Sequence, residues 1–255
     1  MTLLKIKNKI IDLLNVGSNI KRLIERQDTI SARLDSINEK LDLINDNDPR
    51  KPQQLFYKVC EVAQENTIDF IYKNMKHAIC ITDYEEFLAY SVKEKGFEGD
   101  IMEFGVYSGS SINQFSKLAP DVKIYGFDSF EGLPEVWNGY HIFDFNLSGN
   151  LPKVNENIQL IKGWFDESLP FFLQNYNGKC ALLHIDCDLY SSTKTVFDHI
   201  YPYLDKGSVV IFDEFFNYPN YEEHEMKAFF EFVEKREIKF QYLAYCGERV
   251  VVKII

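Results

Sequence analysis

The sequence predicts an α/β protein in which a doubly wound, mainly parallel sheet of seven strands follows an N-terminal helical coiled coil. Three observations support this prediction. Residues 99–255 contain five short apolar segments that alternate with segments of helical periodicity, which is typical of a parallel sheet covered on both faces. Two further apolar segments, joined by a turn at Gly247, predict an antiparallel hairpin at the C-terminus. Residues 1–50 contain no aromatic residue and repeat aliphatic residues at spacings of three and four.

The first predicted element is a coiled-coil helix within residues 1–48. Its heptad seam has Ile20, Gln27, Leu34 and Leu41 at position a, and Leu23, Ile30, Ile37 and Ile44 at position d. Leucine at a combined with isoleucine at d favours trimers or tetramers, so we expect a homo-oligomer formed through residues 20–44. Two alternatives are an amphipathic helix that lies on its own domain and a helix that docks weakly on a membrane surface through Lys5, Lys7 and Lys9.

The remaining elements follow in order along the chain. Residues 53–98 predict an amphipathic, helical lead-in, and residues 99–255 predict the catalytic domain. The expected strands lie at 100–106, 123–129, 158–164, 180–188, 208–214, 239–246 and 248–254, and the expected helices at 109–118, 166–176, 191–204 and 222–236. Residues 130–150 are irregular and rich in aromatic residues, and we expect them to fold over the ligand site.

Charge and hydropathy exclude several classes of protein. The formal net charge is −11 at pH 7, of which residues 1–50 contribute +1 and the remainder −12, so a nucleic-acid partner is not expected. No apolar stretch is long enough for a transmembrane helix, and the N-terminus does not resemble a secretory signal. We therefore expect a cytoplasmic protein.

The carboxyl ends of the predicted strands are where a doubly wound sheet binds its ligands. The first strand is followed by a turn with Gly105 and Gly109, and the second ends at Asp128, 25 residues after Glu103. Glycines allow a close backbone approach, and an acid at this spacing suits the hydroxyls of a ribose. The fingerprint GxGxxG is missing, which favours a nucleoside ligand without a pyrophosphate; the alternative is a tight turn and a helix-capping acid.

Four acidic residues follow the two central strands. Asp186 and Asp188 end one strand, and Asp213 and Glu214 end the next. Adjacent parallel strands bring such carboxylates together, and a divalent cation relieves their repulsion, with Mg²⁺ preferred and Ca²⁺ or Mn²⁺ as alternatives. In the other interpretation, Asp188 and Glu214 cap the helices that follow them.

Two histidines stand out by position. His141 lies in the irregular segment 130–150, where a histidine suits the role of a general base. His184 alternates with apolar neighbours on its strand, and we expect it to be a core histidine with its hydrogen bonds satisfied.

Five segments in fixed order resemble class I S-adenosylmethionine-dependent methyltransferases, and among them the macrocin O-methyltransferase-like group. The resemblance covers Glu103 to Ile254, and the segments that carry it read EFGVYSGSS, YGFDSFEGLPE, LIKGWFDESLP, LHIDCDLYSSTK and VVIFDEFFNYP. The resemblance implies a Rossmann-like methyltransferase fold with S-adenosylmethionine as cofactor. It also implies roles for individual residues. The cofactor-binding residues would be Glu103, Gly105, Gly109, Ser110, Asp128, Ser129, Gly163, Trp164 and Asp186.

The resemblance further implies that Asp186, Asp213 and Glu214 hold Mg²⁺ against two adjacent sugar hydroxyls, and that Asp186 or His141 accepts the proton. The expected function is O-methyl transfer to a hydroxyl of a sugar, a glycosylated small molecule or a glycan. Two alternatives remain: a carboxylate-metal hydrolase on a similar sheet, and a non-catalytic scaffold that binds a nucleoside.

Overall fold

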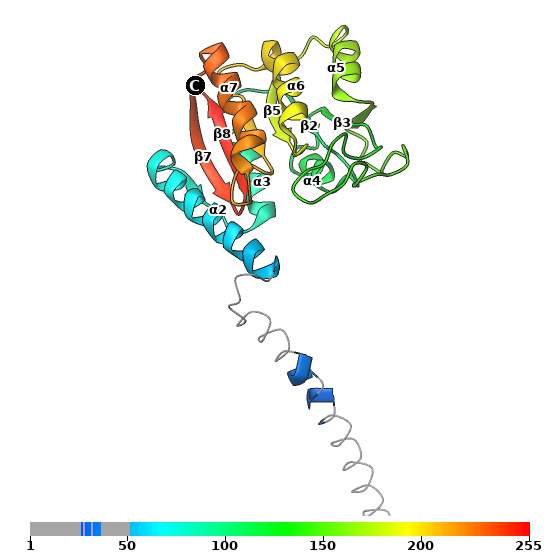
Figure 1. Ribbon diagram of the computed structural model, residues 1–255. Coiled ribbons are helices and arrows are strands. Elements are labelled where there is room, and N and C mark those ends of the chain that lie inside the picture. The colour runs from blue at the N-terminus through cyan, green and yellow to red at the C-terminus, as the bar shows by residue number, and fades with distance from the viewer. Residues whose placement is uncertain (1–26, 28, 32, 37–51) are drawn as a thin grey trace, which may run out of the picture. The chain divides into compact units, whose positions relative to one another are not determined.

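The computed structural model describes residues 27, 29–31, 33–36 and 52–255 (Figure 1). Contacts divide the chain into two compact units, Met1–Lys58 and Val59–Ile255. In the first unit, the described residues between 27 and 36 are helical, and Ile30 and Leu34 of the heptad seam are 58% and 53% exposed. Gln27, a third seam residue, is also described and exposed. The other five seam positions, Ile20, Leu23, Ile37, Leu41 and Ile44, lie outside the described residues, so the coiled coil stays a prediction.

The second unit is built on one sheet of eight strands in the order β1-β7-β8-β6-β5-β2-β3-β4. The strands are β1 (Ile79–Cys80), β2 (Asp100–Phe104), β3 (Ile124–Asp128), β4 (Ile158–Lys162), β5 (Cys180–Ile185), β6 (Val209–Phe212), β7 (Phe240–Cys246) and β8 (Arg249–Ile254). Only β8 runs antiparallel to its neighbours. The seven predicted strands and the C-terminal hairpin are confirmed, and the two-residue strand β1 adds an eighth at the edge.

Six helices of the described chain accompany the sheet: α2 (Pro52–Asn74), α3 (Tyr84–Lys93), α4 (Ser110–Leu118), α5 (Phe165–Leu173), α6 (Tyr190–Ile200) and α7 (Glu225–Arg236). Two short 3-10 helices cover Tyr201–Tyr203 and Tyr221–Glu223. The lead-in over 53–98 is therefore not one helical segment, because β1 separates α2 from α3. Asp83 ends the connection by capping α3, since its carboxylate accepts a hydrogen bond from the Glu86 N–H at 2.8 Å.

Successive side chains of each strand point to opposite faces of the sheet, so the apolar residues form two cores, one on each face. Ile101 and Val209 belong to one apolar cluster, whereas their neighbours Met102 and Val210 belong to the other. Figure 1 shows α5, α6 and α7 along one face, with α3 and α4 behind it. Both faces of the central strands are thus covered, which explains why most residues of these strands are apolar.

The chain order reverses between β2 and β5, which lie side by side at the centre of the sheet. On one side the chain continues from β2 to β3 and β4, and on the other from β5 to β6. This topological switch point is where a doubly wound sheet leaves a crevice outside the carboxyl ends of its strands.

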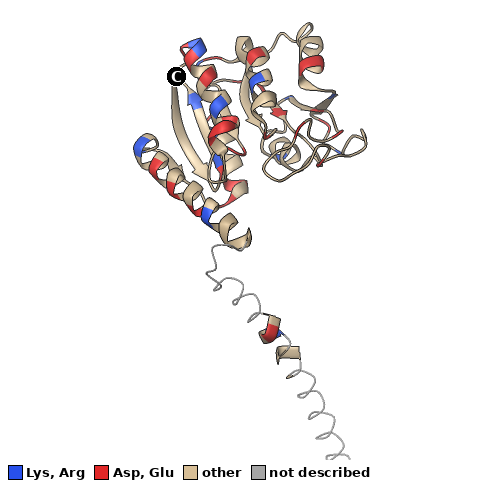
Figure 2. Cartoon of the chain, viewed as in Figure 1, with Lys and Arg blue, Asp and Glu red and all other residues tan. Residues whose placement is uncertain are grey.

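The described surface carries charges of both signs. Figure 2 shows Lys and Arg interspersed with Asp and Glu along α7, where Lys227, Lys235 and Arg236 share the helix with acidic residues. Mixed charge of this kind is typical of a solvated helix face. Within the described residues, every helix is too short or too polar to cross a lipid bilayer.

Candidate active site

A cavity of about 800 Å³ opens at the switch point. The predicted residues that line it are Gly105, Ser110, Asp128, Ser129, Trp164, Asp186 and Glu214. The other predicted residues, Glu103, Gly109, Gly163, Asp213 and His141, are not among its lining residues. The cavity thus joins the glycine turn after β2 to part of the acidic cluster after β5 and β6.

The glycine turn lies directly beside the end of β5. Gly105 has a φ of 95°, and a Cβ atom at this position would lie 1.6 Å from the carbonyl oxygen of Asp186. Only glycine permits this approach of two backbones. Gly109, with a φ of 81°, precedes α4 as its N-cap residue and provides no side-chain cap.

Asp128 fixes the turn from the end of β3. Its Oδ2 accepts hydrogen bonds from the backbone N–H groups of Val106 and Tyr107, both at 2.8 Å, and its Oδ1 accepts one from Phe130 at 2.6 Å. The carboxylate therefore organises the backbone that surrounds the cavity while it also lines the cavity. Next to it, the Gly163 N–H donates to the Asp128 carbonyl at 2.9 Å and places Trp164 against the cavity.

A buried ion pair lies below the turn. Glu103 and His184 are both fully buried, with His184 Nδ1 2.9 Å from Glu103 Oε2, and the Ser111 hydroxyl donates to Glu103 Oε1 at 3.1 Å. Burial opposes a charge on His184, but the adjoining Asp213 and Glu103 carboxylates raise its pKa to about 10. Glu103 of β2 is thus connected to β5 through His184 and to the first turn of α4 through Ser111.

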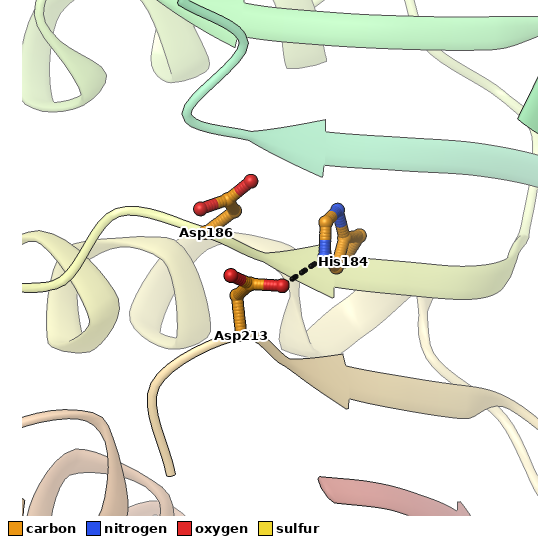
Figure 3. Close-up of side chains that lie close together, drawn as sticks. All are labelled: His184, Asp186 and Asp213. Atoms are coloured by element: carbon orange, nitrogen blue, oxygen red, sulfur yellow. Dashed lines mark ion pairs between the residues drawn. The ribbon is translucent and has the colours of Figure 1, made fainter. Parts of the chain in front are cut away.

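His184 also faces Asp213, although less closely. Its Nε2 lies 3.9 Å from Asp213 Oδ1, which is an ion-pair distance that is too long for a hydrogen bond (Figure 3). This buried nitrogen has no hydrogen-bond partner among the described residues. The expectation of a core histidine is confirmed, whereas only one of its two nitrogens is satisfied.

Asp213 is engaged by a cation. Arg249 Nε lies 2.6 Å from Asp213 Oδ1, and a second guanidinium nitrogen lies 2.9 Å from Oδ2. Although burial opposes ionisation, His184 and Arg249 hold the pKa of Asp213 at about 2. Asp213 is therefore ionised, and its negative charge is balanced by Arg249 and His184.

Three other carboxylates face the cavity together. Asp186, Asp188 and Glu214 each offer an oxygen, and these oxygens lie within 4.8 Å of one another; a second such group joins Asp186 to His184 and Asp213. Neither Asp188 nor Glu214 caps a helix, because the N-cap residues of α6 and α7 are Leu189 and His224. The capping interpretation of these two acids is wrong.

The three cavity acids resist full ionisation. Burial, followed by the charge of Asp213, raises the pKa of Asp186 well above its usual value. Burial raises the pKa of Asp188 to about 6, and burial together with the Asp188 charge raises that of Glu214. Glu214 Oε2 is buried and has no hydrogen-bond partner in the described chain. Three buried carboxyl groups that repel one another when ionised suit a hard divalent cation such as Mg²⁺, which would stabilise their ionised forms.

His141 does not reach the cavity. Its side chain is 86% exposed, and its Nδ1 lies 3.8 Å from Asp144 Oδ2. Among the lining residues that the sequence did not single out as ligands are Tyr107, Ser191, Ser192 and Tyr218. The serines lie in the first turn of α6, three and four residues after Asp188, and their place in the segment LYSST was the available signal.

Solved methyltransferases share this architecture. The O-methyltransferase NovP matches with a TM-score of 0.52 and 21% identity, over 66% of this chain and 78% of that one. The calicheamicin methyltransferase CalS11 matches with a TM-score of 0.53 and 23% identity, over 84% of this chain and 90% of that one. These similarities show the Rossmann-like methyltransferase fold.

Sequence relatives point to the same group. The 8-demethyl-8-(2,3-dimethoxy-alpha-L-rhamnosyl)-tetracenomycin-C 4'-O-methyltransferase of Streptomyces olivaceus is 28% identical over 157 residues, 52% of this chain and 59% of the relative. The mycinamicin III 3''-O-methyltransferase of Micromonospora griseorubida is 26% identical over 151 residues, 49% of this chain and 58% of the relative. The chain thus spans less than two thirds of the length of these relatives. The family model of macrocin-O-methyltransferase (TylF) matches residues 81–242, more than half of the chain, and the protein belongs to this family.

Proposed function

We propose that the protein is an S-adenosylmethionine-dependent O-methyltransferase that acts on a sugar hydroxyl. The observation that supports this most strongly is one cavity in which a glycine turn and a cluster of three carboxylates open side by side. The first feature suits a methyl donor and the second suits a hydroxyl acceptor. Family membership favours this function over the metal-hydrolase and scaffold alternatives.

The donor end would be formed by the turn after β2 and by the ends of β3 and β4. Gly105 and Ser110 would border the methionine part, Asp128 and Ser129 the ribose, and Trp164 the adenine. S-Adenosylmethionine supplies an electrophilic methyl group on a positively charged sulfur. The acidic residues that line the cavity favour such a cation.

The acceptor end would be formed by Asp186, Asp188 and Glu214. These residues fit Mg²⁺, which when bound would lower the pKa of the acceptor hydroxyl. Asp213, the third ligand predicted from the sequence, would remain paired with Arg249 and position the cluster from the side. Asp186 or Asp188 would accept the hydroxyl proton. Holding acceptor and donor in line contributes much of such a rate enhancement.

The acceptor would carry adjacent hydroxyls that reach two of these carboxylates. A sugar fits, and one of the relatives is an O-methyltransferase of a rhamnosyl-tetracenomycin. We further propose that residues 20–44 assemble the protein into a homo-oligomer, and that it works in the cytoplasm, where S-adenosylmethionine is made.

Two measurements test the proposed function. Isothermal titration calorimetry with S-adenosylhomocysteine should show saturable binding, and mass spectrometry should show the gain of one CH₂ in a sugar acceptor from a panel of glycans. A protein that binds no S-adenosylhomocysteine would support the metal-hydrolase alternative. Binding without transfer to any polyhydroxylated acceptor would support the scaffold alternative.

A further inference from the structure

Five aromatic rings form a continuous row along the cavity, here called the aromatic wall. Its members are Tyr107, Phe145, Tyr140, Trp137 and Tyr218, and all five line the cavity. Neighbouring ring centroids lie 5.5, 5.0, 5.3 and 5.9 Å apart in that order. The row therefore connects the donor turn, which contains Tyr107, to the segment after β6, which contains Tyr218.

The wall is closed at one end and open at the other. Trp137 and Tyr218 are 7% and 6% exposed, whereas Tyr140, Tyr107 and Phe145 are 44%, 43% and 38% exposed. The closed end adjoins the acidic cluster, because the Tyr218 hydroxyl donates to the Glu214 carbonyl at 3.2 Å. Rings that only covered the site would be buried, but the three outer rings present apolar faces to solvent.

The backbone holds two of the outer rings in uncommon conformations. Tyr107 has a φ of 43° and Phe145 a φ of 63°, both in the left-handed region that bulky residues rarely adopt. Backbone strain of this kind concentrates at ligand sites, where the surrounding structure enforces it. In the aromatic wall, this strained backbone keeps the side chains of Tyr107 and Phe145 against the cavity, although the backbone conformation itself is unfavourable for these residues.

Backbone hydrogen bonds fix the segment between them. Trp137 and Tyr140 exchange N–H···O bonds at 3.2 and 2.6 Å, and Leu133 donates to the Asp144 carbonyl at 3.0 Å. The wall is therefore formed before any ligand arrives, and little ordering entropy would oppose binding. The buried indole Nε1 of Trp137 has no hydrogen-bond partner among the described residues and offers a donor at the closed end.

The orientation of the rings distinguishes between possible occupants. The planes of Tyr140 and Phe145 are inclined by 43°, and those of Tyr107 and Phe145 by 75°. A flat, fused ring system would need coplanar faces across the outer wall. Successive sugar rings of a glycan are themselves turned relative to one another, and each can place its C–H face on a separate aromatic ring. Asn138, which also lines the cavity, adds a hydrogen-bonding amide beside the rings.

We propose that the aromatic wall is a binding site for an oligosaccharide, with the sugar to be methylated at Trp137 and Tyr218 and the preceding sugars on Tyr140, Phe145 and Tyr107. This assignment rests on the proposed function and narrows the acceptor to a glycan of at least two sugars. A free monosaccharide would use only the closed end and would bind more weakly.

A glycan array tests this assignment. The full-length protein, saturated with S-adenosylhomocysteine, is applied to an array of oligosaccharides, their terminal monosaccharides and 4-nitrophenyl glycosides. We expect at least one oligosaccharide to bind about tenfold more tightly than its terminal monosaccharide. Preference for the nitrophenyl glycosides, or retention of no oligosaccharide, would overturn the proposal.

Variants test whether the aromatic wall is responsible for the preference for an oligosaccharide over its terminal monosaccharide. Tyr140→Ala should abolish the preference for the oligosaccharide, whereas Tyr140→Phe should keep it. Val136→Ala is the matched control, because Val136 is 63% exposed on the same segment and does not line the cavity. Unchanged oligosaccharide affinity in Tyr140→Ala would contradict the assignment. Calorimetry with S-adenosylhomocysteine on the same samples separates this result from a failure of the proposed function, which would appear as lost cofactor binding in the unmodified protein.

Discussion

Arg249 binds both oxygens of the Asp213 carboxylate through two guanidinium nitrogens, at 2.6 and 2.9 Å. The guanidinium also lies over the Tyr84 ring, with its Cζ 4.6 Å from the ring centroid. A planar guanidinium that forms two hydrogen bonds to one carboxylate fixes the orientation of the carboxylate and stabilises its ionised form. The pair joins β8 to the end of β6, and Asp186, Asp188 and Glu214 are the members of the acidic cluster that line the cavity.

We predict that Arg249→Met destabilises the protein by about 3–5 kcal/mol, because the buried Asp213 carboxylate loses the guanidinium that binds both of its oxygens. Urea denaturation at neutral pH measures this change in the free energy of unfolding. Arg249→Lys should cost less, because lysine keeps the charge and loses the fork. The double variant Asp213→Asn/Arg249→Met should recover part of the loss. Equal stability of Arg249→Met and the unmodified protein would contradict the role given to this pair.

Gly105 is the second position where a small change should have a large effect. We predict that Gly105→Ala abolishes binding of S-adenosylhomocysteine and lowers stability, because the added Cβ would meet the Asp186 carbonyl. The matched control is Gly139→Ala, whose φ of 93° is similar but whose Cβ would meet nothing within 4 Å. The control should show only the cost of a left-handed alanine, about 1–2 kcal/mol. Similar losses in both variants would show that backbone strain, and not the close approach, makes Gly105 necessary.

The fold could be predicted from the sequence because its signals are local. Apolar segments such as CALLHI and VVIF are strands in the structure, and the turn at Gly247 joins β7 to β8. Strand β1 was missed because two residues, Ile79 and Cys80, are too few for a period-two pattern. It forms only because β7 provides a partner.

The residues of the candidate site that lie at the carboxyl ends of strands could be predicted from the sequence. Asp128, Asp186 and Glu214 were expected there and line the cavity. Arg249 was missed because its partnership with Asp213 depends on the antiparallel register of β8 against β6. The exposure of His141 depends on how an irregular segment folds, which spacing along the chain does not indicate.

A buried threonine ties α2 to the segment that carries Glu214 and Tyr218. Thr67 is 4% exposed, and its hydroxyl accepts a hydrogen bond from the Asn217 N–H at 2.9 Å while donating to the Ala63 carbonyl at 2.8 Å. We predict that Thr67→Val lowers the free energy of unfolding by about 0.5–1.5 kcal/mol, because the hydrogen bond from the Asn217 N–H to the Thr67 hydroxyl is lost. Thr67→Ser keeps the hydroxyl and should cost less. Thermal unfolding followed by circular dichroism compares the three proteins.

The proposed oligomer makes a prediction for the first unit. Ile30 and Leu34 lie at the heptad seam and are exposed in the single chain. We predict that Ile30→Asp/Leu34→Asp dissociates the oligomer, because burying charges in a coiled-coil seam is unfavourable. Multi-angle light scattering measures the molar mass in solution. Ser36→Asp, outside the seam, should leave the mass unchanged. A double variant with the mass of the unmodified protein would show that residues 20–44 do not hold the subunits together.

Asp186 is the residue on which donor and acceptor ends converge, since its carbonyl oxygen adjoins Gly105 and its carboxylate belongs to both acidic groups. We predict that Asp186→Asn lowers methyl transfer by about 10²-fold or more, because the acceptor loses a ligand or a base. S-Adenosylhomocysteine affinity, measured by calorimetry, should change little, because the backbone at the glycine turn is retained. A chelator should likewise stop transfer, and added Mg²⁺ should restore it. Asp121→Asn, an exposed acid remote from the cavity lining, is the control. Full activity in chelator would remove the metal from the proposed site, and full activity of Asp186→Asn would remove Asp186 from the reaction.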